Sequence, residues 1–223
     1  MTATDTAIDH ANNLFGRMRQ SLSFFDGKYC DTEDACLDYI DTFSSNNFHN
    51  IITNHWSLLS FACYLGFAKV AHRLMDCGAD INQTCYDGWN PLMCSVGHCK
   101  TSLQIRHDIA KELIRRGADV NYISGTTSSI GFSALSVACS HQHEAMAITL
   151  IEAGAQFAYI MDSHIIFNNV PKIKQYIRDI YHEQIKAIIN DKTIDKTTYN
   201  AMAVSFRTTY AVELVGIIAE FII

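Results

Sequence analysis

Cysteine and histidine side chains gather in one stretch of this 223-residue chain. Cys94, His98 and Cys99 lie within six residues of one another, and His107 follows shortly afterwards. Thiolate and imidazole groups are the ligands that zinc favours in proteins, so these residues are the best candidates for a metal site. The sequence has no CxxC pair, however, which is the spacing that usually marks a zinc site. We therefore expect no metal ion and no other cofactor.

Catalysis by a nucleophile would need a cysteine or serine next to a histidine base, and such partners meet in space rather than in sequence. His141 and His143 are the other closely spaced pair, and we expect them to have a structural role in a connecting turn. The chain contains no glycine-rich phosphate loop, nucleophile elbow or kinase motif. These observations favour a protein that is not an enzyme.

Composition and charge narrow the class of protein. Apolar residues make up 48% of the chain and charged residues 18%, which predicts a folded protein. The net charge of −6 argues against nucleic-acid binding, because contacts with phosphate need a basic surface. No apolar run reaches 18 residues, so we expect no transmembrane helix. Because residues 1–13 are polar, we expect no secretory signal, and the eight cysteines are then reduced thiols in the cytoplasm.

The acidic residues are concentrated near the N-terminus. They include Asp31, Glu33, Asp34, Asp38 and Asp41. Such a cluster is typical of a solvated helix face, and the alternative is an acidic docking surface.

An internal repeat predicts the elements that position these residues. Three segments share one pattern of apolar and small residues, at 54–82, 87–121 and 131–155. Trp56 and Trp89 are equivalent and lie 33 residues apart, whereas Gly78 and Gly117 lie 39 apart. The six extra residues fall between two predicted helices, around residues 98–106.

Each segment is typical of two short helices. Ser57, Asn90 and Ser133 precede the first helices, where each side chain can accept a hydrogen bond from a free backbone N–H group. Pro91 takes a first helical position, where its missing N–H has little cost. A glycine follows each second helix, where a left-handed residue ends the helix. These glycines are Gly78, Gly117 and Gly154.

The segments resemble the ankyrin repeat, whose pattern opens as D-G-x-T-P-L-H and closes as G-A-D-x-N. Asp87-Gly88 and Pro91-Leu92 match the opening, and residues 78–82 and 117–121 match the close. The resemblance covers residues 54–157 and implies an all-α solenoid of helix-turn-helix units. The family's histidine is replaced by Ser60, Met93 and Ser136. This departure implies weaker hydrogen bonds between neighbouring repeats.

We predict three repeats, with bounds at residues 54–86, 87–129 and 130–157. Residues 1–53 carry two helical patterns and form either a degenerate repeat or a helical cap, because an array needs its ends covered. Residues 158–223 are predicted to be an all-α extension. Its long first helix begins at Val170-Pro171 and ends at Asn190-Asp191, and more helix is expected from about Thr197.

The resemblance implies that a partner binds along the hairpin tips and the concave face of the first helices. The family's variable surface positions carry apolar residues here: Trp56, Tyr64, Leu65, Tyr86, Trp89 and Phe132. Stacked repeats would align these residues into an exposed stripe, and exposed apolar surface usually marks an interaction site. The alternative is that the rings pack on each other, or under the loop at 122–130, and stabilise the stack.

The sequence therefore predicts a monomeric cytoplasmic module that binds another protein, as an adaptor or inhibitor. Its irregular repeats resemble those of viral ankyrin proteins and of effectors that intracellular bacteria deliver into the host-cell cytoplasm. The alternative function is an enzyme whose active site lies between the last repeat and the C-terminal helices. His164, Tyr181 and His182 would line that site.

Overall fold

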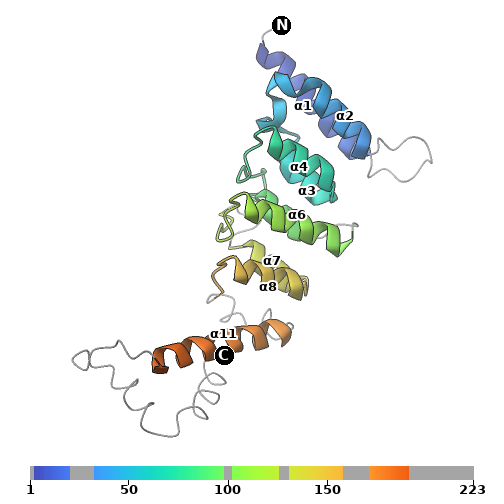
Figure 1. Ribbon diagram of the computed structural model, residues 1–223. Helices are drawn as coiled ribbons and strands as arrows, with labels where there is room; N and C mark the ends of the chain where they lie inside the picture. Colours follow the sequence, from blue (N-terminus) through green and yellow to red (C-terminus); the bar gives the residue numbers. More distant parts are fainter. Residues whose placement is uncertain (1–2, 21–32, 98–101, 126–130, 158–170, 191–223) are drawn as a thin grey trace. The chain divides into compact units, whose positions relative to one another are not determined.

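The computed structural model describes residues 3–20, 33–97, 102–125, 131–157 and 171–190 (Figure 1). The chain divides into two compact units, residues 1–157 and 158–223. Eight of the described α-helices belong to the first unit. Among the described helices, none is both long and apolar enough to cross a membrane.

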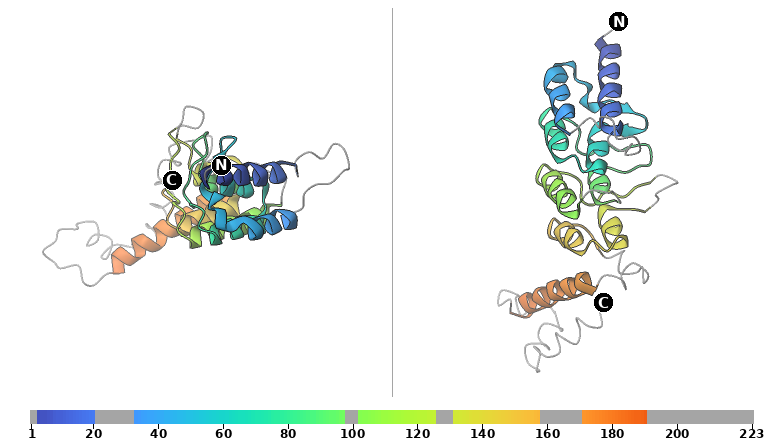
Figure 2. Two further views of the ribbon diagram at one scale, coloured as in Figure 1. Left: turned by 90° about the horizontal axis from the view of Figure 1, so that it is seen from above. Right: turned by 90° about the vertical axis from the view of Figure 1, so that its right-hand side faces the viewer.

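The helices of the first unit form four consecutive pairs. The pairs are α1 (Ala3–Gln20) with α2 (Glu33–Phe43), α3 (Leu58–Leu65) with α4 (Ala68–Asp76), α5 (Pro91–Val96) with α6 (Leu103–Arg115), and α7 (Ala134–Ser140) with α8 (Glu144–Glu152). The first helix of each pair packs on the first helix of the next, from α1 through α3 and α5 to α7. The second helices form another row, in which α2 packs on α4 and α4 on α6 (Figure 2). This arrangement confirms the predicted solenoid.

Side-chain caps begin the inner helices as predicted. Ser57 Oγ accepts the Ser60 N–H at 3.0 Å, and Asn90 Oδ1 accepts the Met93 N–H at 2.9 Å. Ser133 begins α7 in the same way and shares a reciprocal capping box with Ser136. Each cap satisfies a backbone donor that the helix itself leaves unpaired. The turns that follow the second helices use glycines with positive φ, as predicted: Gly78, Gly117 and Gly154.

The inner helices are the most buried part of the unit. All six residues of α5 are buried, as are seven of the eight residues of α3. Ala62, Ser95 and Ala138 take the same place in successive inner helices, and each is fully buried. Small side chains at this place allow the inner helices to pack closely. This packing sets the spacing of the loops that connect neighbouring repeats.

Residues 44–57 form the first of the hairpin segments. Two short 3-10 helices, η1 (Ser44–Asn46) and η2 (Phe48–Asn50), lead into the strands β1 (Ile52–Thr53) and β2 (Trp56–Ser57). The strands pair antiparallel, with Ile52 opposite Ser57 and Thr53 opposite Trp56. A left-handed Asn54 and His55 make the two-residue turn between them.

Three asparagines link each repeat to the next. Asn50 Oδ1 accepts the Asp80 N–H at 2.7 Å, and Asn82 Oδ1 accepts the Asp119 N–H at 2.9 Å. Asn121 Oδ1 accepts the N–H of residue 156 at 2.8 Å. Asn50 thus makes the same bond to the turn after α4 as the two later asparagines make to the turns after α6 and α8. We refer to α1 and α2 as the N-terminal helix pair.

Three of the acidic residues of α2, namely Glu33, Asp34 and Asp41, contact α4. Glu33 Oε1 accepts the backbone N–H groups of Lys69 and Val70, at 2.6 and 3.2 Å. Two ion pairs lie along the same helix pair, Asp34 with Lys69 at 2.9 Å and Asp41 with Arg73 at 2.5 Å. These three acids therefore join the N-terminal helix pair to the next repeat.

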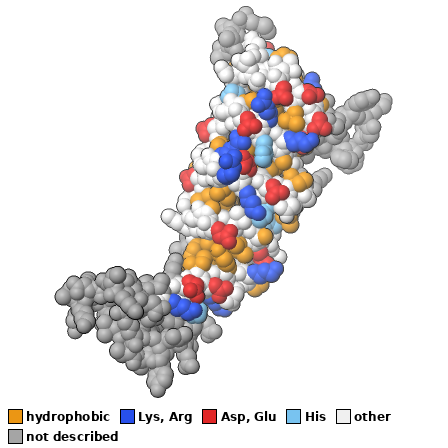
Figure 3. All heavy atoms as spheres, in the orientation of Figure 1, with side chains coloured by type: hydrophobic (Ala, Val, Ile, Leu, Met, Phe, Trp, Pro, Cys, Tyr) orange, Lys and Arg blue, Asp and Glu red, His pale blue; other side chains and the backbone are white. Residues whose placement is uncertain are grey.

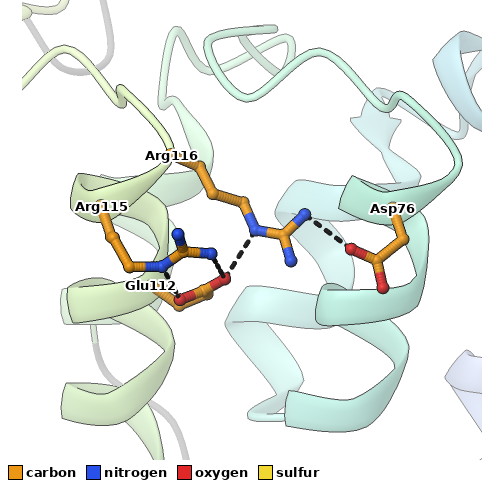
Figure 4. A network of polar contacts seen from close by, with 4 residues as sticks. All are labelled: Asp76, Glu112, Arg115 and Arg116. Atoms are coloured by element: carbon orange, nitrogen blue, oxygen red, sulfur yellow. Dashed lines mark hydrogen bonds and ion pairs between the residues drawn. The ribbon is translucent and has the colours of Figure 1, made fainter.

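A second polar network joins α4 to α6 (Figure 4). Arg116 donates from Nη1 to Asp76 at 2.7 Å and from Nε to Glu112 at 2.6 Å. Arg115 also binds Glu112, and the hydrogen bonds from the two guanidinium groups lower the pKa of that carboxyl to about 2. Figure 3 shows acidic and basic side chains interspersed on one face of the molecule, with patches of hydrophobic side chains between them.

The second unit contributes one described helix, α11 (Pro171–Asn190). Its bounds agree with the long helix that the sequence predicts. Ile173 and Ile177 are buried, one helical turn apart, and Gln175 donates to Asp179 on another face at 2.9 Å. The further helix expected from Thr197 lies outside the described residues.

Candidate protein-binding surface

A hairpin precedes each of the inner helices α3, α5 and α7. In the second hairpin the Trp89 carbonyl accepts the Cys85 N–H at 2.9 Å. In the third, the Phe132 carbonyl accepts the Ser124 N–H at 2.8 Å. With the β1–β2 pairing, these bonds place one aromatic residue at the same position of each hairpin, directly before the helix cap. The three residues are Trp56, Trp89 and Phe132.

Neighbouring hairpins are also bonded to each other. The Tyr86 N–H donates to the His55 carbonyl at 2.8 Å, and the two rings lie 4.7 Å apart between their centroids. Tyr86 is nevertheless 74% exposed, the largest value among the exposed large hydrophobic residues of the described chain. Its backbone is fixed while most of its ring faces solvent, which is the arrangement of a preorganised contact residue.

The aromatic residues predicted for binding differ in their exposure. Phe132 is 39% exposed, whereas Trp56, Tyr64 and Trp89 are half-buried. Leu65 is 5% exposed, so the expectation that it lies on the surface is wrong. It ends α3, which packs against α1, α4 and α5 and therefore has little free surface.

The half-buried rings have packing partners within the fold. Trp56 lies 5.4 Å from Phe61 and 5.2 Å from Tyr64, between ring centroids. Phe61 in turn stacks on Phe15 of α1 at 4.4 Å, which extends the cluster into the preceding repeat. The Trp89 ring lies against Gly97, where an added Cβ would come within 2.7 Å of it. These contacts give Trp56 and Trp89 a role in the stack.

Two exposed residues were missed by the sequence reasoning. Ile52 and Ile123 are each 52% exposed on hairpins. Both stand two residues after a linking asparagine, Asn50 or Asn121, but no sequence motif marks this register around Asn50. We call the exposed set on the hairpins the hairpin surface, and it consists of Ile52, Tyr86, Ile123 and Phe132.

The described hairpin segments that carry the hairpin surface contain exposed acids and no lysine or arginine. The described hairpin segments 44–57, 78–90 and 117–125 contain no basic residue other than histidine. Asp80, Asp87 and Asp119 are exposed on them. Asp80 and Asp119 also accept backbone N–H groups within their own turns, each at 2.9 Å, which fixes these carboxylates at the surface.

The residues considered for metal binding or catalysis are only partly described. Cys94 is buried on α5, while His98, Cys99 and His164 lie outside the described residues. Among the described residues, no three His, Cys, Asp or Glu side chains gather in a way that could hold a metal ion.

The described histidines considered for these roles lie at contacts and turns within the fold. His107 Nε2 lies 2.8 Å from Thr149 Oγ1 and so joins α6 to α8, and burial lowers the pKa of this histidine. His141 and His143 lie at the turn before α8, with ring centroids 5.7 Å apart, and the structural role predicted for them agrees with this position. Tyr181 and His182 are half-buried on α11.

Comparison with known proteins agrees with this geometry. The family model described as ankyrin repeats in three copies matches residues 31–123 and also residues 59–160. A search among curated proteins finds no match. The family match begins just before α2 and ends shortly after α8, and it covers more than half of the chain. The chain belongs to the ankyrin-repeat family.

Proposed function

We propose that this protein binds a partner protein through the hairpin surface. Ankyrin repeats are generally modules of protein–protein interaction. The observation that carries the proposal is Tyr86, which is 74% exposed on a backbone that two neighbouring hairpins fix. Exposed aromatic residues on rigid supports contribute strongly to binding, because they bury a large area with little loss of conformational freedom.

The partner contacts that we propose extend along successive hairpins. Ile52, Ile123 and Phe132 are exposed on the hairpins before and after Tyr86 and supply further apolar area. Trp56, Tyr64 and Trp89 contribute the free edges of rings that also stabilise the fold. Leu65 takes no part because it is buried. The acids beside these residues favour a partner segment that carries lysine or arginine among apolar residues.

Site-directed photo-crosslinking tests this proposal. A benzophenone amino acid replaces Tyr86 in one chain and Leu103 in a second, matched chain. Leu103 is 53% exposed on α6 and lies outside the hairpins, so it controls for exposed apolar surface in general. Irradiation in eukaryotic cell lysate should attach a distinct protein to the first chain and not to the second. Equal labelling from both positions, or none from Tyr86, would contradict the proposal.

We further infer that the protein acts as a monomeric adaptor or inhibitor in the cytoplasm, which is the host-cell cytoplasm if it is a delivered effector. This inference rests on the absence of a recognised catalytic motif in the sequence and on its resemblance in style to such proteins. Light scattering coupled to gel filtration tests the monomer. A mass near 25.0 kDa is expected for the single chain. Imaging of the tagged protein in eukaryotic cells tests its location.

A further inference from the structure

Two carboxylates are held at the same position of the second and third hairpins. Asp80 stands two residues before the linking asparagine Asn82, and Asp119 stands two residues before Asn121. Each carboxylate accepts the N–H of its own asparagine at 2.9 Å through Oδ1. Both aspartates are exposed, so the other oxygen of each can accept from a cation outside the chain.

Hydrogen bonds between the hairpins fix the register of these two carboxylates. Asn82 Oδ1 accepts the Asp119 N–H at 2.9 Å, so the turn that holds Asp80 is bonded directly to Asp119. The hairpins lie along one edge of the first unit, beside the stacked helices (Figure 1). Because packed helices lie about 8–10 Å apart, we infer a separation of roughly 10 Å between the two carboxylates.

Exposed apolar side chains accompany the carboxylates along the hairpins. Ile52 stands two residues after Asn50 on the first hairpin, and Ile123 stands two residues after Asn121 on the third. Tyr86 is exposed on the second hairpin, where its N–H is bonded to the first. An apolar contact is therefore available on each hairpin, and the second and third hairpins add a carboxylate.

The inner helices beside the hairpins offer little surface to a helical partner. Seven of the eight residues of α3 are buried, as are all six of α5 and six of the seven of α7. A bound helix needs a groove that covers its apolar face. An extended segment needs only the line of hairpins, and because it rises about 3.3 Å per residue, three of its residues span the roughly 10 Å between neighbouring hairpins.

We propose that the hairpin surface binds an extended segment of the partner in which two lysine or arginine residues stand three positions apart among apolar residues. This inference rests on the proposed function and specifies the class of segment that binds. The two basic residues pair with Asp80 and Asp119, and the apolar residues contact Tyr86 and Ile123. A nucleic acid, or the same hairpins of a second copy, would instead bring like charges together.

Selection from a library of random dodecapeptides displayed on phage tests the proposal on the full chain. We expect the enriched peptides to share a pair of basic residues three positions apart, with apolar residues beside them. One glycine inserted between the two basic residues should weaken binding about two- to fivefold, as should serine in place of either one. Enriched peptides without basic residues, or with basic residues seven positions apart as a helix would place them, would overturn the proposal.

Matched variants assign the basic residues to the two carboxylates. Asp80→Asn/Asp119→Asn keeps the acceptor oxygen of each turn and removes both charges. Asp108→Asn/Asp179→Asn is the control, because these aspartates are also exposed and each accepts a side-chain hydrogen bond at 2.9 Å, but on α6 and α11. Once circular dichroism shows that both variants fold, fluorescence anisotropy at low salt should give about tenfold weaker peptide binding for the hairpin variant and a change within about twofold for the control. Equal affinities of the two variants would contradict the proposal.

The same peptides separate this inference from the function on which it rests. Each enriched peptide is irradiated with the chain that carries a benzophenone amino acid at Tyr86. Labelling by peptides that have the expected pair of basic residues supports both. Labelling by peptides that lack this pair refutes the class of segment and leaves the hairpin surface as the binding site, whereas no labelling refutes both.

Discussion

Glu33 should stabilise the junction between the N-terminal helix pair and the first recognisable repeat far more than its neighbour Asp34 does. The helix α4 begins after Phe67 without a side-chain cap of its own. Glu33 supplies this cap from the neighbouring repeat, because its carboxylate accepts the N–H groups of Lys69 and Val70 at 2.6 and 3.2 Å. The negative charge also lies at the positive end of the α4 dipole.

The size of the effect follows from these contacts. Loss of a helix cap costs about 1 kcal/mol, and hydrogen bonds to a charged group contribute about 1.5 to 3 kcal/mol when they are buried. Because the Glu33 contacts are partly open to solvent, we expect Glu33→Ala to lower the free energy of unfolding by about 1 to 2 kcal/mol. Glu33→Gln keeps an acceptor oxygen and loses the charge, so its cost should be about half as large.

Asp34→Ala is the matched control. Asp34 also lies in the first turn of α2, and its ion pair with Lys69 joins side chains that are 71% and 63% exposed. Exposed ion pairs contribute little, so this variant should cost at most about 0.5 kcal/mol. Urea unfolding followed by circular dichroism measures the cost, and hydrogen exchange at Lys69 and Val70 locates it. Equal costs for Glu33→Ala and Asp34→Ala, or unchanged exchange at those two amides, would refute the reasoning.

Three further predictions concern the core and the polar contacts between repeats. Gly97→Ala places a Cβ within 2.7 Å of the Trp89 ring without backbone strain. The variant should lower the free energy of unfolding by about 1 to 3 kcal/mol and shift the tryptophan fluorescence. Unchanged fluorescence would show that the ring does not pack there. The pKa of Glu112 is lowered to about 2, so its contribution to the free energy of unfolding is present above pH 4.5 and is lost as the pH falls towards 2. Urea titrations at a series of pH values should show that Glu112→Gln lacks this part of the loss of stability in acid. An unaltered dependence of stability on pH in the variant would contradict the network. Burial lowers the pKa of His107, so the unfolded chain binds more protons than the folded chain below about pH 6.5, and the free energy of unfolding falls as the pH falls. His107→Gln should make this dependence on pH less steep and leave the part due to His49, whose pKa burial also lowers. An equally steep dependence in the variant would count against the His107–Thr149 contact.

The predictable part of the fold is the part that repeats in the sequence. Ser57, Asn90 and Ser133 could be recognised as caps because a helix start needs an acceptor at a fixed local position. The contact of Glu33 with α4 could not be predicted, since its acceptor and donor lie 36 and 37 residues apart and no pattern in the chain relates them. Asn50 was missed for a related reason, because its segment lacks the G-A-D letters although it makes the same bond.

The candidate site was predictable in position and less so in exposure. Spacing alone placed Trp56, Trp89 and Phe132 at one equivalent position, as the hairpin hydrogen bonds confirm. Exposure depends on what the neighbouring helices and rings cover, so Leu65 is buried and Trp89 lies over Gly97. The exposed Ile52 and Ile123 belong to no motif and are found only once the chain is folded.

The linking asparagines allow repeats of different length to stack on one another in the same way. Asn82 and Asn121 lie after the second helices of their pairs, at the hairpin ends of the helices. The extra residues near 98–106 fall between α5 and the first turn of α6, and some of them lengthen α6 itself, at the opposite ends of these helices. Insertions there leave the asparagine bonds between neighbouring units in place, because these bonds lie at the hairpin ends. The edge between the two helices of a pair can thus lengthen without breaking these bonds, whereas a change in the length of a hairpin would move the asparagine away from its partner.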